Sequence, residues 1–239
     1  IISDEIHSDL VLPSSGKKHV PLALVARSLG YENMVMTMSG PGKTWNLAGC
    51  HSGFVVMESP EMRKRYMEVV GHAYLSYGSV FATTTMLAAY ANAAEVEQQR
   101  QQRQQRQQQE SSVLGSSTGA NTMTDPASWL EDVLQYLDGN IDALEQFVAE
   151  RLPRIRVMRP EASFLVWLDC RRMGMASSQQ LESFFTDKAK VFLSSGSGFG
   201  GKSAAGFMRI NVACPRSFLL GALKRIARAY ESVFPAGAQ

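Results

Sequence analysis

Hydrophobic positions near the start of the chain form short apolar runs separated by a stretch with helical spacing. Ile1-Ile2 is typical of the end of a buried strand, and residues 31–39 (YENMVMTMS) and 54–59 (FVVMES) are typical of two more strands. Residues 21–30 (PLALVARSLG) have helical spacing and end on a glycine that favours a helix C-cap. This strand–helix–strand order predicts a parallel strand pair with a right-handed crossover. Residues 60–94 then predict helices.

The second half of the chain repeats the alternation of helices and strands. A long amphipathic helix is predicted after Asp125-Pro126, because apolar residues recur every three or four positions. The stripe consists of Trp129, Val133, Leu137, Ile141, Leu144 and Val148. Strands are predicted at 162–169 and 207–213, a helix at 177–190, and a final helix from Pro215. The apolar stripe of this final helix consists of Leu219, Leu220, Leu223, Ile226, Tyr230 and Val233. Residues 125–239 are therefore predicted to form a smaller α/β C-terminal domain.

Residues 95–124 separate these two parts and have a different composition. A Gln/Arg tract is followed by a Ser/Gly-rich stretch, and neither can bury apolar surface. We interpret the segment as a flexible insertion. A nucleic-acid-binding arm is the alternative, but three arginines without interleaved aromatic residues give it little support. We therefore predict no nucleic-acid partner.

Composition narrows the class of protein. The 239 residues are 45% hydrophobic with a net charge of +2, which points away from a nucleic-acid or membrane surface. No apolar run approaches the length of a membrane span. The cysteines, Cys50, Cys170 and Cys214, are widely spaced and favour reduced thiols in the cytoplasm. The four histidines lack metal-ligand spacing, so no metal site is predicted.

The beginning of the sequence also carries information. There is no initiating Met and no signal peptide, and the chain opens directly on an apolar strand pattern. We interpret the sequence as the C-terminal part of a longer protein, or as a gene product whose first exon is missing.

Lys43 lies in a stretch that resembles a phosphate-binding loop, residues 36–49 (MTMSGPGKTWNLAG). A P-loop needs a glycine six residues before its lysine, and that position is Thr37. The nucleotide-binding interpretation therefore fails. The alternative is an amine nucleophile that condenses with an aldehyde cofactor.

An amine of that kind requires partners around a pyridoxal ring. The ring nitrogen needs a carboxylate, and Asp4 follows an apolar strand as Lys43 follows the next one. Open α/β sheets bind ligands at the carboxyl ends of strands, so both groups are expected at one edge. His7 is placed to hydrogen-bond the ring phenolate. The structural alternatives are a turn or cap role for Asp4 and a surface or core role for His7.

Three motifs in order resemble fold-type I pyridoxal-phosphate enzymes: SDEIHSDL at 3–10, GPGKTWNLAG at 40–49 and GFMRINVACPRS at 206–217. The branch they resemble most is the cystathionine β-lyase-like C–S lyases of the class I/II aminotransferase superfamily. The resemblance implies an α/β fold, the C-terminal part of a PLP-dependent transferase-like fold. Residues 1–94 would belong to its PLP-binding large domain, with a partial parallel-type sheet, and 125–239 to its small domain. A homodimer is also implied.

The resemblance also implies roles for individual residues. Lys43 would be the Schiff-base lysine and then the general base on the α-proton, with pyridoxal 5'-phosphate as cofactor. Asp4 would partner the pyridinium nitrogen, and His7 the phenolic oxygen. Arg209 would bind the substrate α-carboxylate, since its planar fork makes two parallel bonds. Asn211 and Arg216 are predicted to be structural.

The chain departs from the family pattern around the phosphate. Many relatives have a serine three residues before the lysine, where this chain has Gly40. Ser39 or backbone N–H groups are the predicted substitutes. Aminotransferases often have an arginine eight residues after the lysine, where His51 stands here. Because the lyase branch also lacks that arginine, the difference favours the lyase.

The predicted reaction is β-elimination from a sulfur-containing amino acid, giving pyruvate, ammonia and a thiol. The alternative within the family is transamination. A third possibility, of another class, is a noncatalytic truncated paralogue that keeps an interaction surface. In the family an N-terminal half supplies further active-site groups and covers the sheet. Without it we expect uncovered apolar sheet faces and an inactive fragment.

Overall fold

A computed structural model describes residues 1–75, 78–91, 126–175 and 177–235. It divides into two units, Ile1–Asp9 with Lys18–Val133 and Leu10–Lys17 with Leu134–Gln239. The segment Leu10–Lys17 thus belongs with the C-terminal part, which no pattern in the sequence indicated. The predicted insertion at 95–124 lies outside the described residues, and the division around it stays a prediction.

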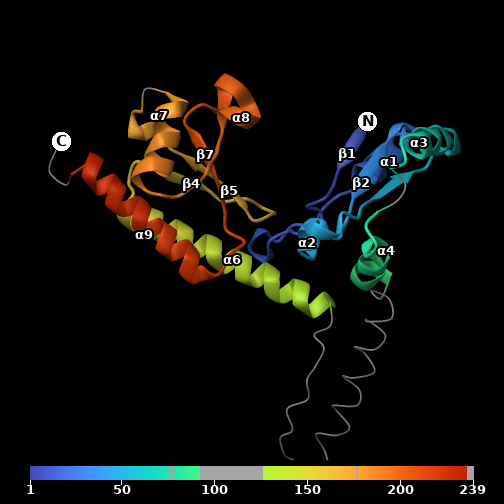
Figure 1. The fold of residues 1–239 in the computed structure, drawn as a ribbon, viewed down its shortest axis with the longest axis horizontal. Helices are drawn as coiled ribbons and strands as arrows, with labels where there is room; N and C mark the ends of the chain where they lie inside the picture. The colour runs from blue at the N-terminus through green and yellow to red at the C-terminus, as the bar shows by residue number, and fades with distance from the viewer. Residues whose placement is uncertain (76–77, 92–125, 176, 236–239) are drawn as a thin grey trace, which may run out of the picture. The chain divides into compact units, whose positions relative to one another are not determined.

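The first unit is built on a three-stranded sheet with the order β1-β2-β3. Its elements are β1 (Ile2–Asp4), α1 (Leu22–Ser28), β2 (Met36–Ser39), α2 (Pro41–Thr44), β3 (Phe54–Met57), α3 (Pro60–His72) and α4 (Ala82–Met86) (Figure 1). β1 and β2 are parallel, as predicted, with Asp4 opposite Met38. β3 is antiparallel to β2, with Phe54 opposite Ser39, so the sheet is mixed.

Both faces of this sheet carry exposed apolar side chains. Ile1 and Ile2 are 71% and 68% exposed, so the prediction that the chain opens on a buried strand is wrong for this structure. Among the described residues, the first unit buries just three hydrophobic side chains, Ala26, Val35 and Met57. The helices of the first unit leave Ile2, Met38, Phe54 and Val56 of the sheet exposed. The expected uncovered faces are thus confirmed.

The second unit holds a four-stranded antiparallel sheet in the order β4-β5-β7-β6. Its elements are α6 (Pro126–Arg151, its first residues belonging to the first unit), β4 (Arg156–Met158), β5 (Leu165–Asp169), α7 (Ser178–Ser183), β6 (Ser194–Ser195), α8 (Ser197–Gly200), β7 (Phe207–Asn211) and α9 (Arg216–Val233). The helix predicted at 177–190 is α7 followed by a π-helical turn at Phe184–Lys188. The two short strands β4 and β6 were not predicted.

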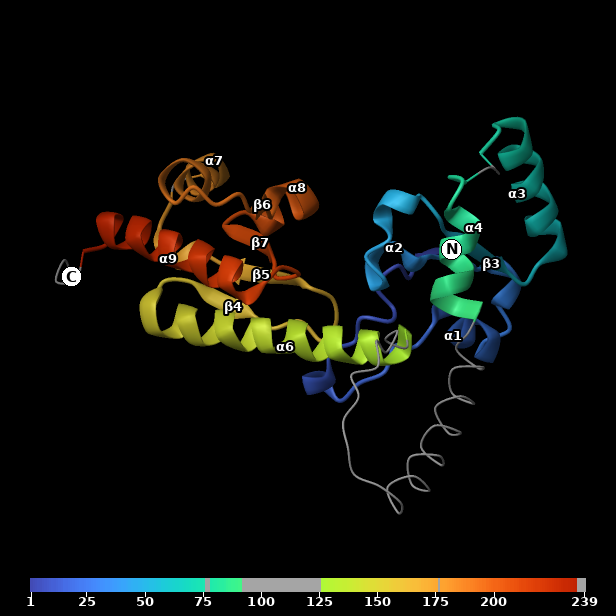
Figure 2. The same ribbon diagram turned by 60° about the horizontal axis from the view of Figure 1, so that its bottom comes forward.

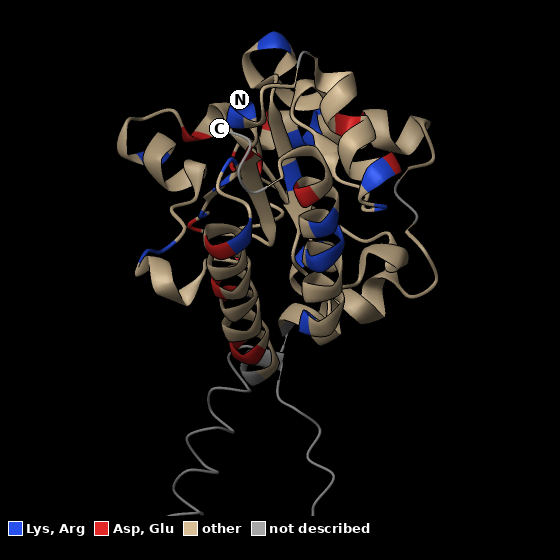
Figure 3. Cartoon of the chain, turned by 90° about the vertical axis from the view of Figure 1, so that its left-hand side faces the viewer, with Lys and Arg blue, Asp and Glu red and all other residues tan. Residues whose placement is uncertain are grey.

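Most of the hydrophobic core lies in this second unit. The predicted stripes on α6 and α9 face inward, and the two helices lie side by side in both views (Figures 1 and 2). The buried stripe residues are Leu137, Ile141, Leu144 and Val148 on α6, and Leu219, Leu223, Ile226 and Tyr230 on α9. The charged residues of α6 are mainly acidic, and those of α9 are mainly basic (Figure 3).

The strands of the second unit bury alternate residues. Val166 and Leu168 of β5 and Met208 and Ile210 of β7 are at most 4% exposed. Successive side chains of a strand point to opposite faces, so Arg209 lies on the face away from these four residues. No helix in the described part of the chain has the length and hydropathy needed to cross a bilayer.

Candidate active site

The carboxyl ends of β1 and β2 lie next to each other at one edge of the first sheet. β1 ends at Asp4, and β2 continues one residue past the paired Met38 to Ser39. The Asp4 side chain is exposed, and its Oδ1 accepts a hydrogen bond from the Ile6 backbone N at 3.2 Å. Because the strands are parallel, the segments that follow them leave the sheet at the same edge, as predicted.

Lys43 lies on α2, the helix that begins two residues after β2. Its side chain is exposed, and among the described residues it has no hydrogen bond or ion pair. The next residue, Thr44, is 1% exposed, and its Oγ1 donates to Oδ2 of Asp9 at 3.0 Å. The helix is therefore anchored to the turn after β1 through Thr44, while the Lys43 amine is left available.

Ser39, the predicted phosphate ligand, has another partner for its hydroxyl proton. Its Oγ donates to the backbone O of Glu5 at 3.2 Å, which joins the ends of β1 and β2. A phosphate oxygen needs a donor, so this contact would have to be exchanged for one to the cofactor. The predicted role of Ser39 stays a prediction.

Packing explains why residue 40 is a glycine. A Cβ placed on Gly40 would lie 2.8 Å from the Ser52 backbone O and 2.9 Å from the Gly53 Cα. The chain after β2 thus passes directly against the chain before β3, and a serine side chain does not fit there. His7 is half-buried in the turn at residues 6–9, and its predicted contact with the cofactor is untested.

Arg209 belongs to the second unit and lies on β7, on the sheet face opposite the buried Met208 and Ile210. It is half-buried and pairs with Trp167 on one side and Ser194 on the other. Its guanidinium carbon lies 4.0 Å from the centroid of the Phe199 ring, which also makes an edge-to-face contact with Trp167. The cation–π contact orients the guanidinium while leaving its N–H donors available for a carboxylate.

The structure supports structural roles for Asn211 and Arg216, as predicted. Asn211 Oδ1 accepts from the Ala213 backbone N at 2.8 Å. Arg216 Nε donates to Asn140 Oδ1 at 3.0 Å, and its backbone N donates to the Tyr136 hydroxyl at 2.8 Å. Both residues are therefore engaged in the connection between β7 and α9.

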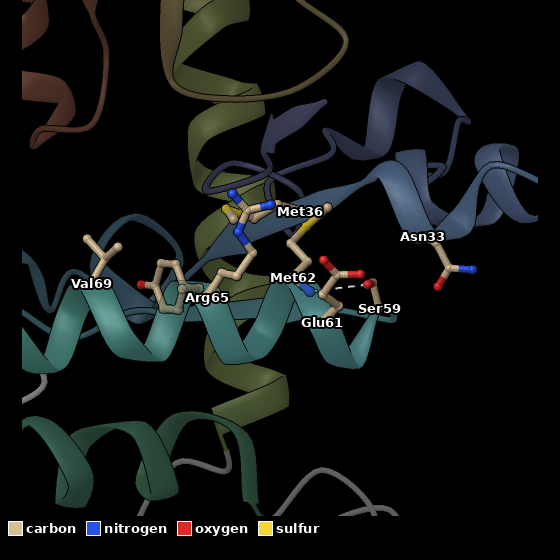
Figure 4. Close-up of a pocket in the computed structure, with 8 residues that line it drawn as sticks. Asn33, Met36, Ser59, Glu61, Met62, Arg65 and Val69 are labelled. Atoms are coloured by element: carbon tan, nitrogen blue, oxygen red, sulfur yellow. Dashed lines mark hydrogen bonds between the residues drawn. The ribbon is translucent and has the colours of Figure 1, made fainter.

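On the described part of the first unit, one hollow includes a predicted site residue and another, larger one does not. The larger, about 520 Å³, runs between β2 and α3 and contains none of the predicted residues; its lining includes Met36, Met62, Arg65, Tyr66 and Val69 (Figure 4). The smaller, about 250 Å³, is lined by residues that include Glu5, Asp9, Thr37, Ser39 and Tyr90. Burial, together with the charge of Asp9, raises the pKa of Tyr90 to about 12, so its phenol stays protonated.

Sequence reasoning missed Glu5, Thr44 and Asp9. Glu5 and Asp9 belong to the same 3–10 motif as Asp4, and Thr44 follows the predicted lysine. Two further acidic residues within five positions of Asp4 were the available signal. Among the described residues, no three His, Cys, Asp or Glu side chains group closely enough to hold a metal ion.

The chain is similar to known proteins over nearly its whole length. It is 28% identical over 229 residues to the cystathionine β-lyase PatB of Bacillus subtilis, covering 96% of this chain and 49% of PatB. A PLP-bound crystal structure from Clostridium difficile 630 is 33% identical, with a TM-score of 0.76, covering 96% of this chain and 49% of that one. The chain is a homologue of the class I/II pyridoxal-phosphate enzymes.

Other findings qualify this relationship. No protein-family model matches the chain. An aspartate aminotransferase of Pyrococcus horikoshii is 24% identical over 237 residues, covering 97% of this chain and 48% of that protein. The chain spans about half the length of the curated relatives it matches. The similarity to the Clostridium difficile structure confirms the predicted fold class.

Proposed function

We propose that this chain contributes the lysine, the ring-nitrogen carboxylate and the substrate-binding arginine to a pyridoxal-phosphate-dependent C–S lyase. The substrate would be a sulfur-containing amino acid, and the products pyruvate, ammonia and a thiol. The observation that carries the proposal is the position of Asp4 at the end of β1 and of Lys43 just after β2, two adjacent parallel strands. The similarity to PatB supports the lyase reaction.

The donor set fits the cofactor at two of its three recognition points. Pyridoxal phosphate requires an amine for its aldehyde, a carboxylate for its ring nitrogen and donors for its phosphate. Lys43 offers an exposed amine, and the Asp4 carboxylate is exposed with one backbone hydrogen bond. The phosphate donors would come from backbone N–H groups near Gly40, or from Ser39 after its hydroxyl leaves Glu5.

When bound, the cofactor supplies an electron sink that stabilises negative charge at the α-carbon of an amino acid. Asp4 would keep the ring nitrogen protonated, because an ionised carboxylate within hydrogen-bond distance stabilises the cationic form. Lys43 Nζ would remove the α-proton. Arg209 would hold the substrate α-carboxylate with two parallel N–H donors.

Transamination is the second candidate, because an aspartate aminotransferase is among the relatives. Both reactions begin with removal of the α-proton by Lys43. They differ in the fate of the substrate: elimination releases pyruvate and a thiol, whereas transamination passes the amino group to a keto acid. The products therefore distinguish the candidates.

The test is reductive trapping on the full 239-residue chain. The protein is incubated with pyridoxal phosphate and treated with borohydride, and the modified peptide is identified by mass spectrometry. We expect the adduct on Lys43 and its loss in Lys43→Ala. Lys64→Ala, which removes an exposed lysine of α3, is the matched control and should leave the adduct unchanged.

Pyruvate and thiol release from cystathionine is measured separately, on chain that is loaded with pyridoxal phosphate and not treated with borohydride, because the reduced adduct can no longer react with the substrate amine. A folded chain that forms no Lys43 adduct would contradict the proposal and favour the noncatalytic alternative. An adduct with amino transfer to a keto acid, and no thiol release, would favour the aminotransferase.

A further inference from the structure

Glu5 carries a buried carboxylate beside the predicted cofactor carboxylate Asp4. Glu5 is 8% exposed. Its Oε1 accepts from the Ser3 hydroxyl and from the Leu22 backbone N, each at 3.0 Å, and its Oε2 lies 2.8 Å from His19 Nε2. A buried carboxylate is tolerated only when such donors compensate for lost hydration. Three donors from three parts of the first unit therefore meet on this side chain.

The backbone of Glu5 joins the two strand ends of the candidate site. Its N donates to the Met38 O at 2.8 Å, which extends the β1–β2 pairing one residue beyond Asp4. Its O accepts from the Ser39 hydroxyl at 3.2 Å and from the Ser8 backbone N at 2.9 Å. The backbone of Glu5 thus contacts both the end of β2 and the turn that contains His7.

Electrostatics keep the side chain ionised. Burial by itself raises the pKa of the Glu5 carboxyl, but the hydrogen bonds from His19, Leu22 and Ser3 outweigh it, and the pKa lies below its ordinary value. The carboxylate accepts a hydrogen bond from the backbone N–H of Leu22, the first residue of α1. The N–H groups of the first turn of a helix have no partner within the helix. The contact with His19 and this backbone hydrogen bond together hold the beginning of α1 against β1.

We propose that Glu5 is a positioning residue for Asp4. Its side chain holds the chain after β1 in place, so that the Asp4 carboxylate keeps a fixed position relative to the end of β2 and α2. The inference rests on the proposed function, because Asp4 needs a fixed position only if it meets a cofactor ring. Glu5 itself does not touch the cofactor.

The experiment compares Glu5→Ala, Glu5→Gln and His19→Ala with the unmodified chain. Glu58→Ala is the matched control, because Glu58 is a more exposed acid of the same unit that pairs with Arg27. Two quantities are measured on each protein: the dissociation constant for pyridoxal phosphate, by absorbance titration, and the pH midpoint of the bound-cofactor absorbance band. Far-UV circular dichroism reports folding.

We expect Glu5→Ala to raise the dissociation constant about ten-fold and to shift the pH midpoint. This is the effect of losing one strong charge-assisted hydrogen bond, here the proposed one between Asp4 and the cofactor ring nitrogen. Glu5→Gln keeps the acceptor for Leu22 and should stay within about three-fold of the unmodified chain. His19→Ala should shift both quantities in the same direction as Glu5→Ala, by less. Glu58→Ala should change neither.

A folded Glu5→Ala with an unchanged dissociation constant and pH midpoint would overturn the positioning role. If Glu5→Ala does not fold, His19→Ala decides, and unchanged values there would overturn it equally. Failure of the unmodified chain to bind the cofactor at Lys43 would instead overturn the proposed function, and the role of Glu5 with it.

Discussion

Asn140 is a fully buried polar residue whose removal should strongly destabilise the second unit. It lies on α6 with 0% of its surface exposed. Its Nδ2 donates to the backbone O of Val212 at 2.9 Å and of Cys214 at 3.0 Å, and its Oδ1 accepts from Arg216 Nε. These bonds tie α6 to the connection between β7 and α9. Asn140→Ala removes all of them at once.

The magnitude follows from the hydrogen bonds. Each is worth about 1 kcal/mol net, so losing the three together costs about 3 kcal/mol. Alanine is a better helix former than asparagine and returns roughly 0.5 kcal/mol. We therefore expect the free energy of unfolding to fall by about 2–3 kcal/mol.

Urea unfolding followed by Trp167 fluorescence measures this change. Trp45 and Trp129 belong to the first unit, so Trp45→Phe and Trp129→Phe in all proteins leave Trp167 as the reporter of the second. With a urea slope of about 2 kcal/mol per molar, the midpoint should fall by about 1 M. Gln146→Ala, an exposed change on the same helix, is the control. If Asn140→Ala changes the midpoint no more than this control does, the reasoning from buried hydrogen bonds is refuted.

Two more predictions concern packing and charge. Gly40→Ala forces a Cβ against the Ser52 carbonyl and should cost about 1–3 kcal/mol, whereas Gly49→Ala, with open space around its Cα, should cost far less; thermal unfolding separates them. Burial raises the pKa of the Asp138 carboxyl, but its hydrogen bonds and the Arg159 guanidinium lower it below its ordinary value overall. Asp138 should therefore stabilise the second unit above about pH 4 and cease to do so as pH falls through its lowered pKa. In a pH series of urea midpoints, Asp138→Asn should reduce the acid-side slope, and an unchanged slope would contradict this assignment.

The order of elements and the residues of the candidate site followed from local patterns. The apolar stripes on α6 and α9 predicted both helices, because a 3.6-residue period is a property of the sequence itself. The order of strand, helix and strand predicted that Asp4 and Lys43 follow parallel strands. Motif resemblance supplied the chemistry of these two residues and of Arg209, and the comparisons support the family.

The long-range contacts could not be predicted from the sequence and were determined only by the tertiary structure. The antiparallel direction of β3, the return of Leu10–Lys17 to the second unit and the burial of Glu5 depend on residues far apart in the sequence. The requirement for glycine at position 40 depends likewise on the chain at 52–53. Local propensity describes how a segment folds, but burial and strand pairing depend on what packs against it. For the same reason Ile1-Ile2 has the pattern of a buried strand and is exposed here: its apolar side chains have no covering layer in this structure.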